Sequence, residues 1–165
     1  MQRLILTLPF AYLLASCAAQ EPITDESDFR MGIPTGSRFT LTQDVTVPEG
    51  WARVTIQNGA VVDSRRDINR SQPFCELGTD SVSRGEPQVV TADEFVGGSA
   101  VRSRSTTIGR EDKTYTTRIT LRSEQQPNVR TLTCEQTGDP MFSRDLTITQ
   151  IRTALGGIIE LQLAQ

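Results

Sequence analysis

The strongest constraint on the fold is a repeated alternation of apolar and polar residues that begins near Ser37. Phe39 and Leu41, and then Val45 and Val47, alternate with polar neighbours. A period of two residues is typical of β-strands with one buried face. The abundance of threonine, valine and isoleucine, interrupted by glycine and proline, also suits strands and turns. The alternation therefore predicts a β-rich domain.

Turn residues divide this β-rich region into segments. Strands are predicted at residues 38–47, 51–57, 60–62, 73–77, 100–108, 114–121, 129–135 and 158–163. Hairpins are expected across Pro48-Glu49-Gly50, Asn58-Gly59 and residues 109–113. Gly97-Gly98 is expected to break the chain, and the charged stretch 63–71 reads as a solvated loop.

A single helix is predicted close to the C-terminus. Thr147 and Gln150 have the spacing of a capping box, and Leu146 and Ile151 have the spacing of the accompanying hydrophobic staple. Gly156 is a typical helix stop. The predicted fold is mainly β: an antiparallel sandwich or small barrel of about eight strands, with one short C-terminal helix before the last strand.

The N-terminus has the three parts of a secretory signal peptide, predicted at residues 1–16. Arg3 is followed by a run rich in leucine, which ends at the small residues Ala15 and Ser16. This apolar run is shorter than the roughly 20 residues that a membrane-spanning helix needs. Residues 17–36, with four acidic side chains and two prolines, are predicted to form a flexible tether. A single domain is then predicted at residues 37–165.

The sequence Leu14-Ala15-Ser16-Cys17 resembles the lipobox of bacterial lipoproteins. The resemblance implies cleavage before Cys17, a diacylglycerol on its thiol and a fatty acyl group such as palmitate on its amine. Ala18 favours the outer membrane, so the expected location is the bacterial cell envelope, lipid-anchored and facing the periplasm. Ordinary signal cleavage after Ala19 is the alternative.

The remaining cysteines agree with this interpretation. Three thiols in an exported protein leave one unpaired. If Cys17 carries lipid, Cys75 and Cys134 remain as a pair for a disulfide in an oxidising compartment. Two free buried thiols are the alternative. The chain also resembles, loosely, small proteobacterial envelope proteins with an Ile-Gln-Asn-Gly hairpin, a Pro-aromatic-Cys-Glu strand and a late cysteine, and this resemblance likewise implies that the two cysteines pair.

Several function classes lack support in the sequence. The chain has no histidine, which removes the commonest general base and the commonest transition-metal ligand. A Ser-Lys dyad would depend on Lys113, the only lysine, in a predicted turn. Adjacent acidic residues point to opposite faces of a strand. We therefore expect no enzymatic activity, no metal and no cofactor. With a net charge of −3 and no basic run, nucleic-acid binding also lacks support.

One surface is a candidate for partner binding. Five arginines on the predicted hairpin of residues 100–121 and just beyond it form the candidate basic face: Arg102, Arg104, Arg110, Arg118 and Arg122. The alternative is a solvated hairpin with acidic neighbours. Trp51 and Phe39 are expected in the core. The expected function is a non-enzymatic envelope lipoprotein, held at the membrane by Cys17, that serves as a protein-interaction or structural module. The alternative is a periplasmic binding domain for a lipid or other small apolar ligand.

Overall fold

The computed structural model describes residues 32–82, 84–106, 112–139 and 145–165. In these residues, ten strands and one helix follow in the order β1 (Arg38–Leu41), β2 (Val45–Val47), β3 (Arg53–Gln57), β4 (Ala60–Val62), β5 (Phe74–Thr79), β6 (Gln88–Val90), β7 (Asp93–Thr106), β8 (Lys113–Arg122), β9 (Val129–Gly138), α2 (Ile148–Leu155) and β10 (Ile159–Gln162). The protein is therefore mainly β, with one short helix before the last strand, as the sequence predicted.

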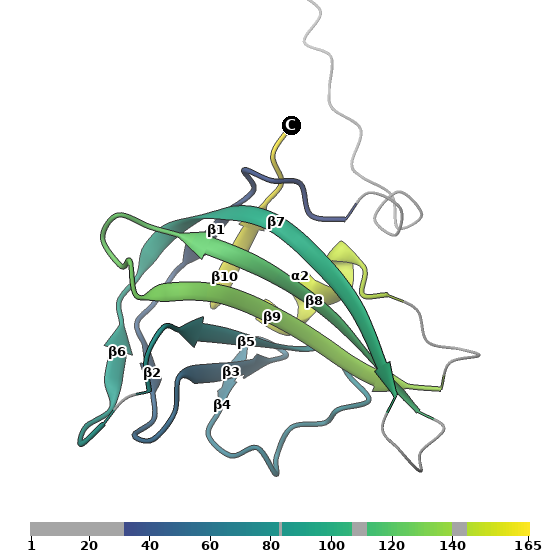
Figure 1. The fold of residues 1–165 in the computed structure, drawn as a ribbon, viewed down its shortest axis with the longest axis horizontal. Coiled ribbons are helices and arrows are strands. Elements are labelled where there is room, and N and C mark those ends of the chain that lie inside the picture. The colour runs from purple at the N-terminus through teal and green to yellow at the C-terminus, as the bar shows by residue number, and fades with distance from the viewer. Residues whose placement is uncertain (1–31, 83, 107–111, 140–144) are drawn as a thin grey trace, which may run out of the picture.

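Eight strands form one antiparallel sheet in the order β10-β1-β7-β8-β9-β5-β3-β4, and β2 pairs with β6 in a small second sheet. Figure 1 shows the large sheet curling, with the long strands β7, β8 and β9 arching over β5 and β3, and α2 on the inner side. The architecture is a half-barrel. Its curl gives the sheet an inner and an outer face.

The inner face holds the core. Side chains from both ends of the sheet and from α2 are almost wholly buried there: Phe39, Phe95, Leu77, Ile119, Leu132, Ile151 and Leu155. Burial of each such side chain stabilises the fold by roughly 1.5–3 kcal/mol. Ile33 also belongs to this core. Within the described residues, the core thus includes a residue four positions before Ser37, where the sequence placed the boundary between tether and domain.

The helix connects the two ends of the sheet. Thr147 and Gln150 form the capping box that the sequence predicted, and Ile148, Ile151, Ala154 and Leu155 are buried. The helix packs on β3 and β5 and leads directly into β10. The turn of the β3–β4 hairpin closes on its far end, where the Gly59 N–H donates to the Ala154 carbonyl at 3.0 Å. Among the described residues, no helix is long and apolar enough to cross a membrane.

Two local predictions about the strands were wrong. Residues 38–47 and 51–57 do not form a hairpin, because β1 pairs with β7 and β10, β2 with β6, and β3 with β4 and β5. Gly97-Gly98 does not break the chain either. β7 runs through both glycines with a register shift against β8 between Gly97 and Ala100. A side chain at Gly97 would lie 2.7 Å from the Phe39 ring, so glycine is needed for this close approach.

Candidate functional site

The structure does not bring the five predicted arginines onto one face. Arg102 lies opposite Thr117, on the inner side of the β7–β8 pair, and Arg104 lies opposite the buried Tyr115. Arg118 lies opposite Val101, on the outer side, and Arg122 faces Val96 there. Arg110 and Cys17 lie outside the described residues. The candidate basic face is therefore split between the two sides of the sheet.

Arg104 has a structural partner. Its Nε and Nη2 donate to the two carboxylate oxygens of Asp145, at 2.9 and 2.7 Å. The hydrogen bond to Arg104 holds the pKa of Asp145 below its usual range. The guanidinium also lies 5.8 Å from the Tyr115 ring centroid. Through these hydrogen bonds, Arg104 connects β7 to Asp145, in the segment that precedes α2.

The two core cysteines lie directly opposite each other. Cys75 of β5 pairs in register with Cys134 of β9, and their sulfur atoms are 2.11 Å apart, at bonding distance. Both residues are completely buried. This position suits a cross-link between two central strands and gives the sulfurs no access to a substrate.

The outer face of β3, β5 and β9 is partly covered by residues 63–72, of which 63–71 were predicted to be a solvated loop. Ile68 of this loop is buried. The Gln57 side chain fixes the loop: its Nε2 donates to the Asn69 carbonyl at 2.8 Å, and its Oε1 accepts from the Asn69 N–H at 3.0 Å. The loop is thus attached to the sheet, and it places Arg65 and Arg70 over the outer face.

Under this loop lies a buried carboxylate, Glu76 of β5. Only 11% of its side chain is exposed. Arg53 Nη1 donates to one Glu76 oxygen at 2.8 Å, and Arg65 Nη2 lies 3.9 Å from the other. Two guanidinium groups therefore share one carboxylate, which satisfies the requirement that a buried charge be paired.

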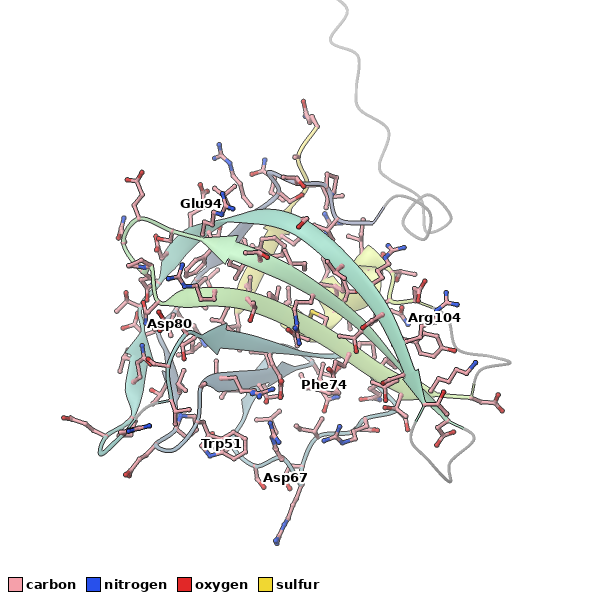
Figure 2. The ribbon with its side chains drawn as sticks, in the orientation of Figure 1. Trp51, Asp67, Phe74, Asp80, Glu94 and Arg104 are labelled. Atoms are coloured by element: carbon pink, nitrogen blue, oxygen red, sulfur yellow. A yellow bond between two sulfur atoms is a disulfide. The ribbon has the colours of Figure 1, made fainter. Side chains whose placement is uncertain are left out.

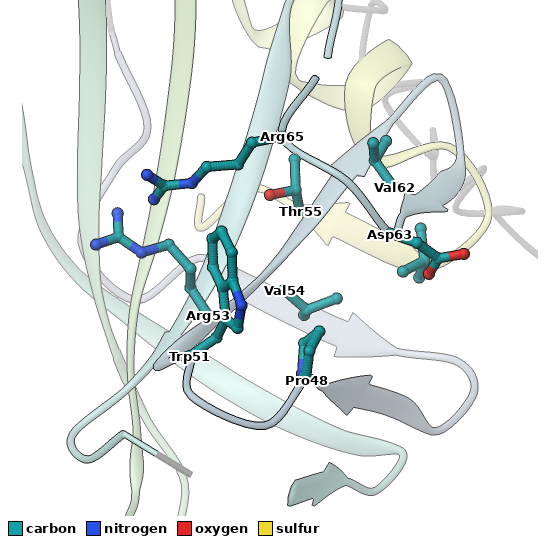
Figure 3. Close-up of a pocket in the computed structure, with 9 residues that line it drawn as sticks. Pro48, Trp51, Arg53, Val54, Thr55, Val62, Asp63 and Arg65 are labelled. Carbon is teal, nitrogen blue, oxygen red and sulfur yellow. The ribbon is translucent and has the colours of Figure 1, made fainter. Parts of the chain in front are cut away.

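Beside this group, Trp51 is exposed at the surface. Its relative exposure is 37%, the Arg65 guanidinium lies 4.7 Å from its ring centroid, and a cation–π contact holds the indole in place. Figure 3 shows Trp51 alongside Arg53 and Arg65, whose guanidinium groups point the same way. Figure 2 shows Trp51 well away from Arg104. The expectation that Trp51 belongs to the core was wrong, whereas Phe39 is in the core.

Next to Arg53 the outer face is hollowed. We call this hollow of about 270 Å³ the outer groove. It is lined by Ala52, Arg53, Glu76, Gly78, Thr79, Arg118, Thr131 and Thr133. Glycine is needed at position 78, because a side chain there would lie 2.6 Å from the Thr131 hydroxyl oxygen. The outer groove is open to solvent, and most of its side chains are polar or charged.

Positive charge predominates around the outer groove. Arg53 and Arg65 approach the carboxylate of Glu76, and Arg118 lines the same groove. Within the described part of the chain, Arg118 is in no ion pair. The other nearby carboxylate, Glu135, is partly desolvated and close to Glu76, and both effects raise its pKa. The arrangement can bind an anionic group through a guanidinium and the threonine hydroxyls.

Sequence reasoning found Arg118 but missed Arg53, Arg65, Glu76 and Trp51 as members of a site. The alternation does place the side chains of Arg53 and Glu76 on the opposite face of the sheet from those of the buried Val54 and Leu77. The strand order was needed to bring them together. In the described part of the chain, no group of three or more acidic or cysteine side chains has the geometry to hold a metal ion.

Comparison of the chain with protein-family models, with curated proteins and with solved structures found no match in any of the three.

Proposed function

We propose that this protein is a non-enzymatic lipoprotein of the bacterial envelope that binds a protein partner through the surface around Trp51. The observation that carries the proposal is the exposed indole, which is held by Arg65 and lies next to Arg53, a residue that also lines the outer groove. Tryptophan and arginine are the residues most enriched among those that dominate binding energy at protein interfaces. An indole already fixed in the free protein loses little conformational entropy when a partner binds.

The anchor in this proposal is lipid on Cys17. Its support is the lipobox Leu14-Ala15-Ser16-Cys17 and its position directly after the apolar run. The lipid would hold the domain at the outer membrane, on the periplasmic side. Stable anchoring needs more than one acyl chain, which lipoprotein modification supplies.

The alternative, a binding domain for a lipid or small apolar ligand, requires a sizeable apolar cavity. The described side chains on the inner face of the sheet pack against α2 in one core cluster. The outer groove is open and mostly polar in its lining residues. These features favour partner binding over enclosure of an apolar molecule.

The test is a cross-linking pull-down of the lipidated protein from its own envelope, compared with Trp51→Ala. The native protein should capture a specific protein partner, and Trp51→Ala should reduce this capture about tenfold, as expected for an interface anchor. Val89→Ala is the matched control, since Val89 is an exposed apolar side chain of the small second sheet. Equal capture by Trp51→Ala would contradict the proposed surface, and co-purification of lipid without protein would favour the ligand-binding alternative.

Cys17→Ser tests the anchor in the same preparation. The variant should leave the membrane fraction on sedimentation, and it should lose the partner if that partner is met only at the membrane. Sedimentation with membranes to the same extent as the native protein would rule out the lipid anchor.

A further inference from the structure

We propose that the outer groove binds a carboxylate side chain from an acidic segment of the partner protein, between Arg118 and the hydroxyls of Thr131 and Thr133, while an apolar neighbour in that segment packs on Trp51. This inference rests on the proposed function, since it gives the chemistry of the partner. It starts from the charges around the outer groove.

The charge balance identifies Arg118 as the available cation. Arg53 and Arg65 both approach Glu76, and the Arg53–Glu76 contact is a 2.8 Å hydrogen bond. Arg118, across the outer groove on β8, is exposed and has no ion-pair partner among the residues that the structure describes. One free guanidinium matches one carboxylate, with which it can form two parallel hydrogen bonds.

The groove also supplies neutral hydrogen-bond donors. Thr131 and Thr133 of β9 line it, and Arg118 is paired in register with Thr133. Beside Thr131 in the groove, Gly78 carries no side chain, and one there would meet the Thr131 hydroxyl oxygen at 2.6 Å. A carboxylate seated there can accept from the guanidinium and from a hydroxyl group at once, so the groove offers more than a surface charge.

The same charges argue for a short acidic segment instead of a polyanion. The whole chain has a net charge of −3, which repels nucleic acid and anionic membrane surfaces at long range. The carboxylates of Glu76 and Glu135 on the same face offset part of the positive charge. The positive region is therefore small, and Trp51 beside it provides an apolar contact that a peptide side chain can use.

Trp51 is the only tryptophan of the chain, so its fluorescence reports directly on this surface. The full-length lipidated protein, in neutral detergent micelles, is titrated with the acetylated and amidated pentapeptide Ala-Leu-Glu-Leu-Ala. The twin peptide with glutamine in place of glutamate is the ligand control. We expect saturable change in Trp51 emission with the glutamate peptide and at least about tenfold weaker binding of the glutamine twin, since a charge-assisted hydrogen bond is lost.

The protein variants separate a specific site from general electrostatics. Arg118→Gln should weaken binding of the glutamate peptide about tenfold, and Arg118→Lys, which keeps the charge but loses the planar fork, should give an intermediate loss. Arg122→Gln is the matched control, because Arg122 is an exposed arginine on the same strand and the same outer face. It should bind as the native protein does.

Four results would overturn the inference. One is equal binding of the two peptides, and a second is equal losses in Arg118→Gln and Arg122→Gln. Another is an Arg118-dependent response to inorganic phosphate at lower concentrations than to the peptide, which would mark a site for a free anion. The last is Arg118-dependent binding of phosphatidylglycerol vesicles, which would mark a membrane contact.

The failure of this inference is distinguishable from failure of the proposed function. Trp51-dependent capture of a partner with no response to the peptide would overturn only the carboxylate site. Arg118-dependent peptide binding without any captured partner would leave the carboxylate site in place and overturn the proposed interaction with an envelope protein.

Discussion

At the scale of single residues, a loop that covers the outer face decides whether a charged side chain there is exposed or buried. Period-two alternation predicts that Glu76 and Glu135 point away from the core, and they do. It does not predict that residues 63–72 lie over this face. Glu76 becomes buried and needs arginine partners, while Glu135 is desolvated beside it. The sequence contains both carboxylates, but their environment depends on a loop that the local pattern describes as solvated.

Glu135→Gln should increase stability at neutral pH. Desolvation and then the nearby Glu76 raise the pKa of Glu135 in the folded protein above its ordinary value of 4.5. Native stability therefore falls as pH rises from about 4.5 through the raised pKa, because the unfolded chain releases its proton first. Urea unfolding from pH 3 to pH 8 should show a stability gain in Glu135→Gln at pH 7 that disappears near pH 3. The exposed Glu124→Gln is the control, and a pH-independent gain would refute this origin.

At the scale of elements, local rules predicted most pieces and missed several pairings. The capping box of α2 and the Asn58-Gly59 hairpin are decided by neighbours in sequence, so their patterns were sufficient. The strands β2 and β3 flank a good turn, yet they join different sheets. β2 pairs instead with β6, which is distant in the chain, and no local pattern encodes that choice.

The bulge in β7 explains why the arginines of the candidate basic face do not lie on one side of the sheet. From Asp93 the inward positions run through Phe95 and Gly97, and the register shift then makes Ala100 and Arg102 inward. A shift of one residue reverses the face of every side chain that follows it. Without the shift, Arg102 and Arg104 would share a face with Arg118. The sequence signals a glycine pair there, but not the bulge.

Gly156→Ala should be strongly destabilising. Gly156 has φ +53° and ψ −136°, a conformation that is essentially restricted to glycine. A side chain there would also lie 2.3 Å from the Gly59 Cα in the β3–β4 turn. Strain and overlap together predict a loss of about 2–4 kcal/mol in unfolding free energy. Thermal denaturation would measure it.

Gly157→Ala is the matched control for that substitution. A side chain at Gly157 would meet nothing within 4 Å. Its stability should stay close to that of the native protein. Similar losses in the two variants would mean that the contact between α2 and the β3–β4 turn does not account for the effect.

At the scale of the whole molecule, the cysteine pair joins two strands in the middle of the large sheet. Residues 75 and 134 are separated by 59 positions. A bond between them restricts the unfolded chain and contributes about 4 kcal/mol in the chain-entropy model. The fold class was predicted from the sequence, and so was the choice of Cys75 and Cys134 as the two cysteines that pair. The strand order, which places these cysteines opposite each other, was not predicted.

The bond itself is open to a direct test. Proteolysis without reductant should yield a peptide that joins Cys75 to Cys134, identified by mass spectrometry. Reductant, or the double substitution Cys75→Ala and Cys134→Ala, should lower the melting temperature markedly. Two alkylatable thiols in the native, unreduced protein would refute the bond.

The pairing of β1 with β10 has a consequence for the order of folding. β1 (Arg38–Leu41) pairs with β7 on one side and with β10 (Ile159–Gln162), which is distant in the sequence, on the other. A sheet closed by contacts this distant in sequence folds slowly, typically in milliseconds to seconds, because loop entropy must be overcome first. Phe39 and Leu41 are not fully buried until β10 has paired with β1. The domain therefore completes its core only when β10 is present.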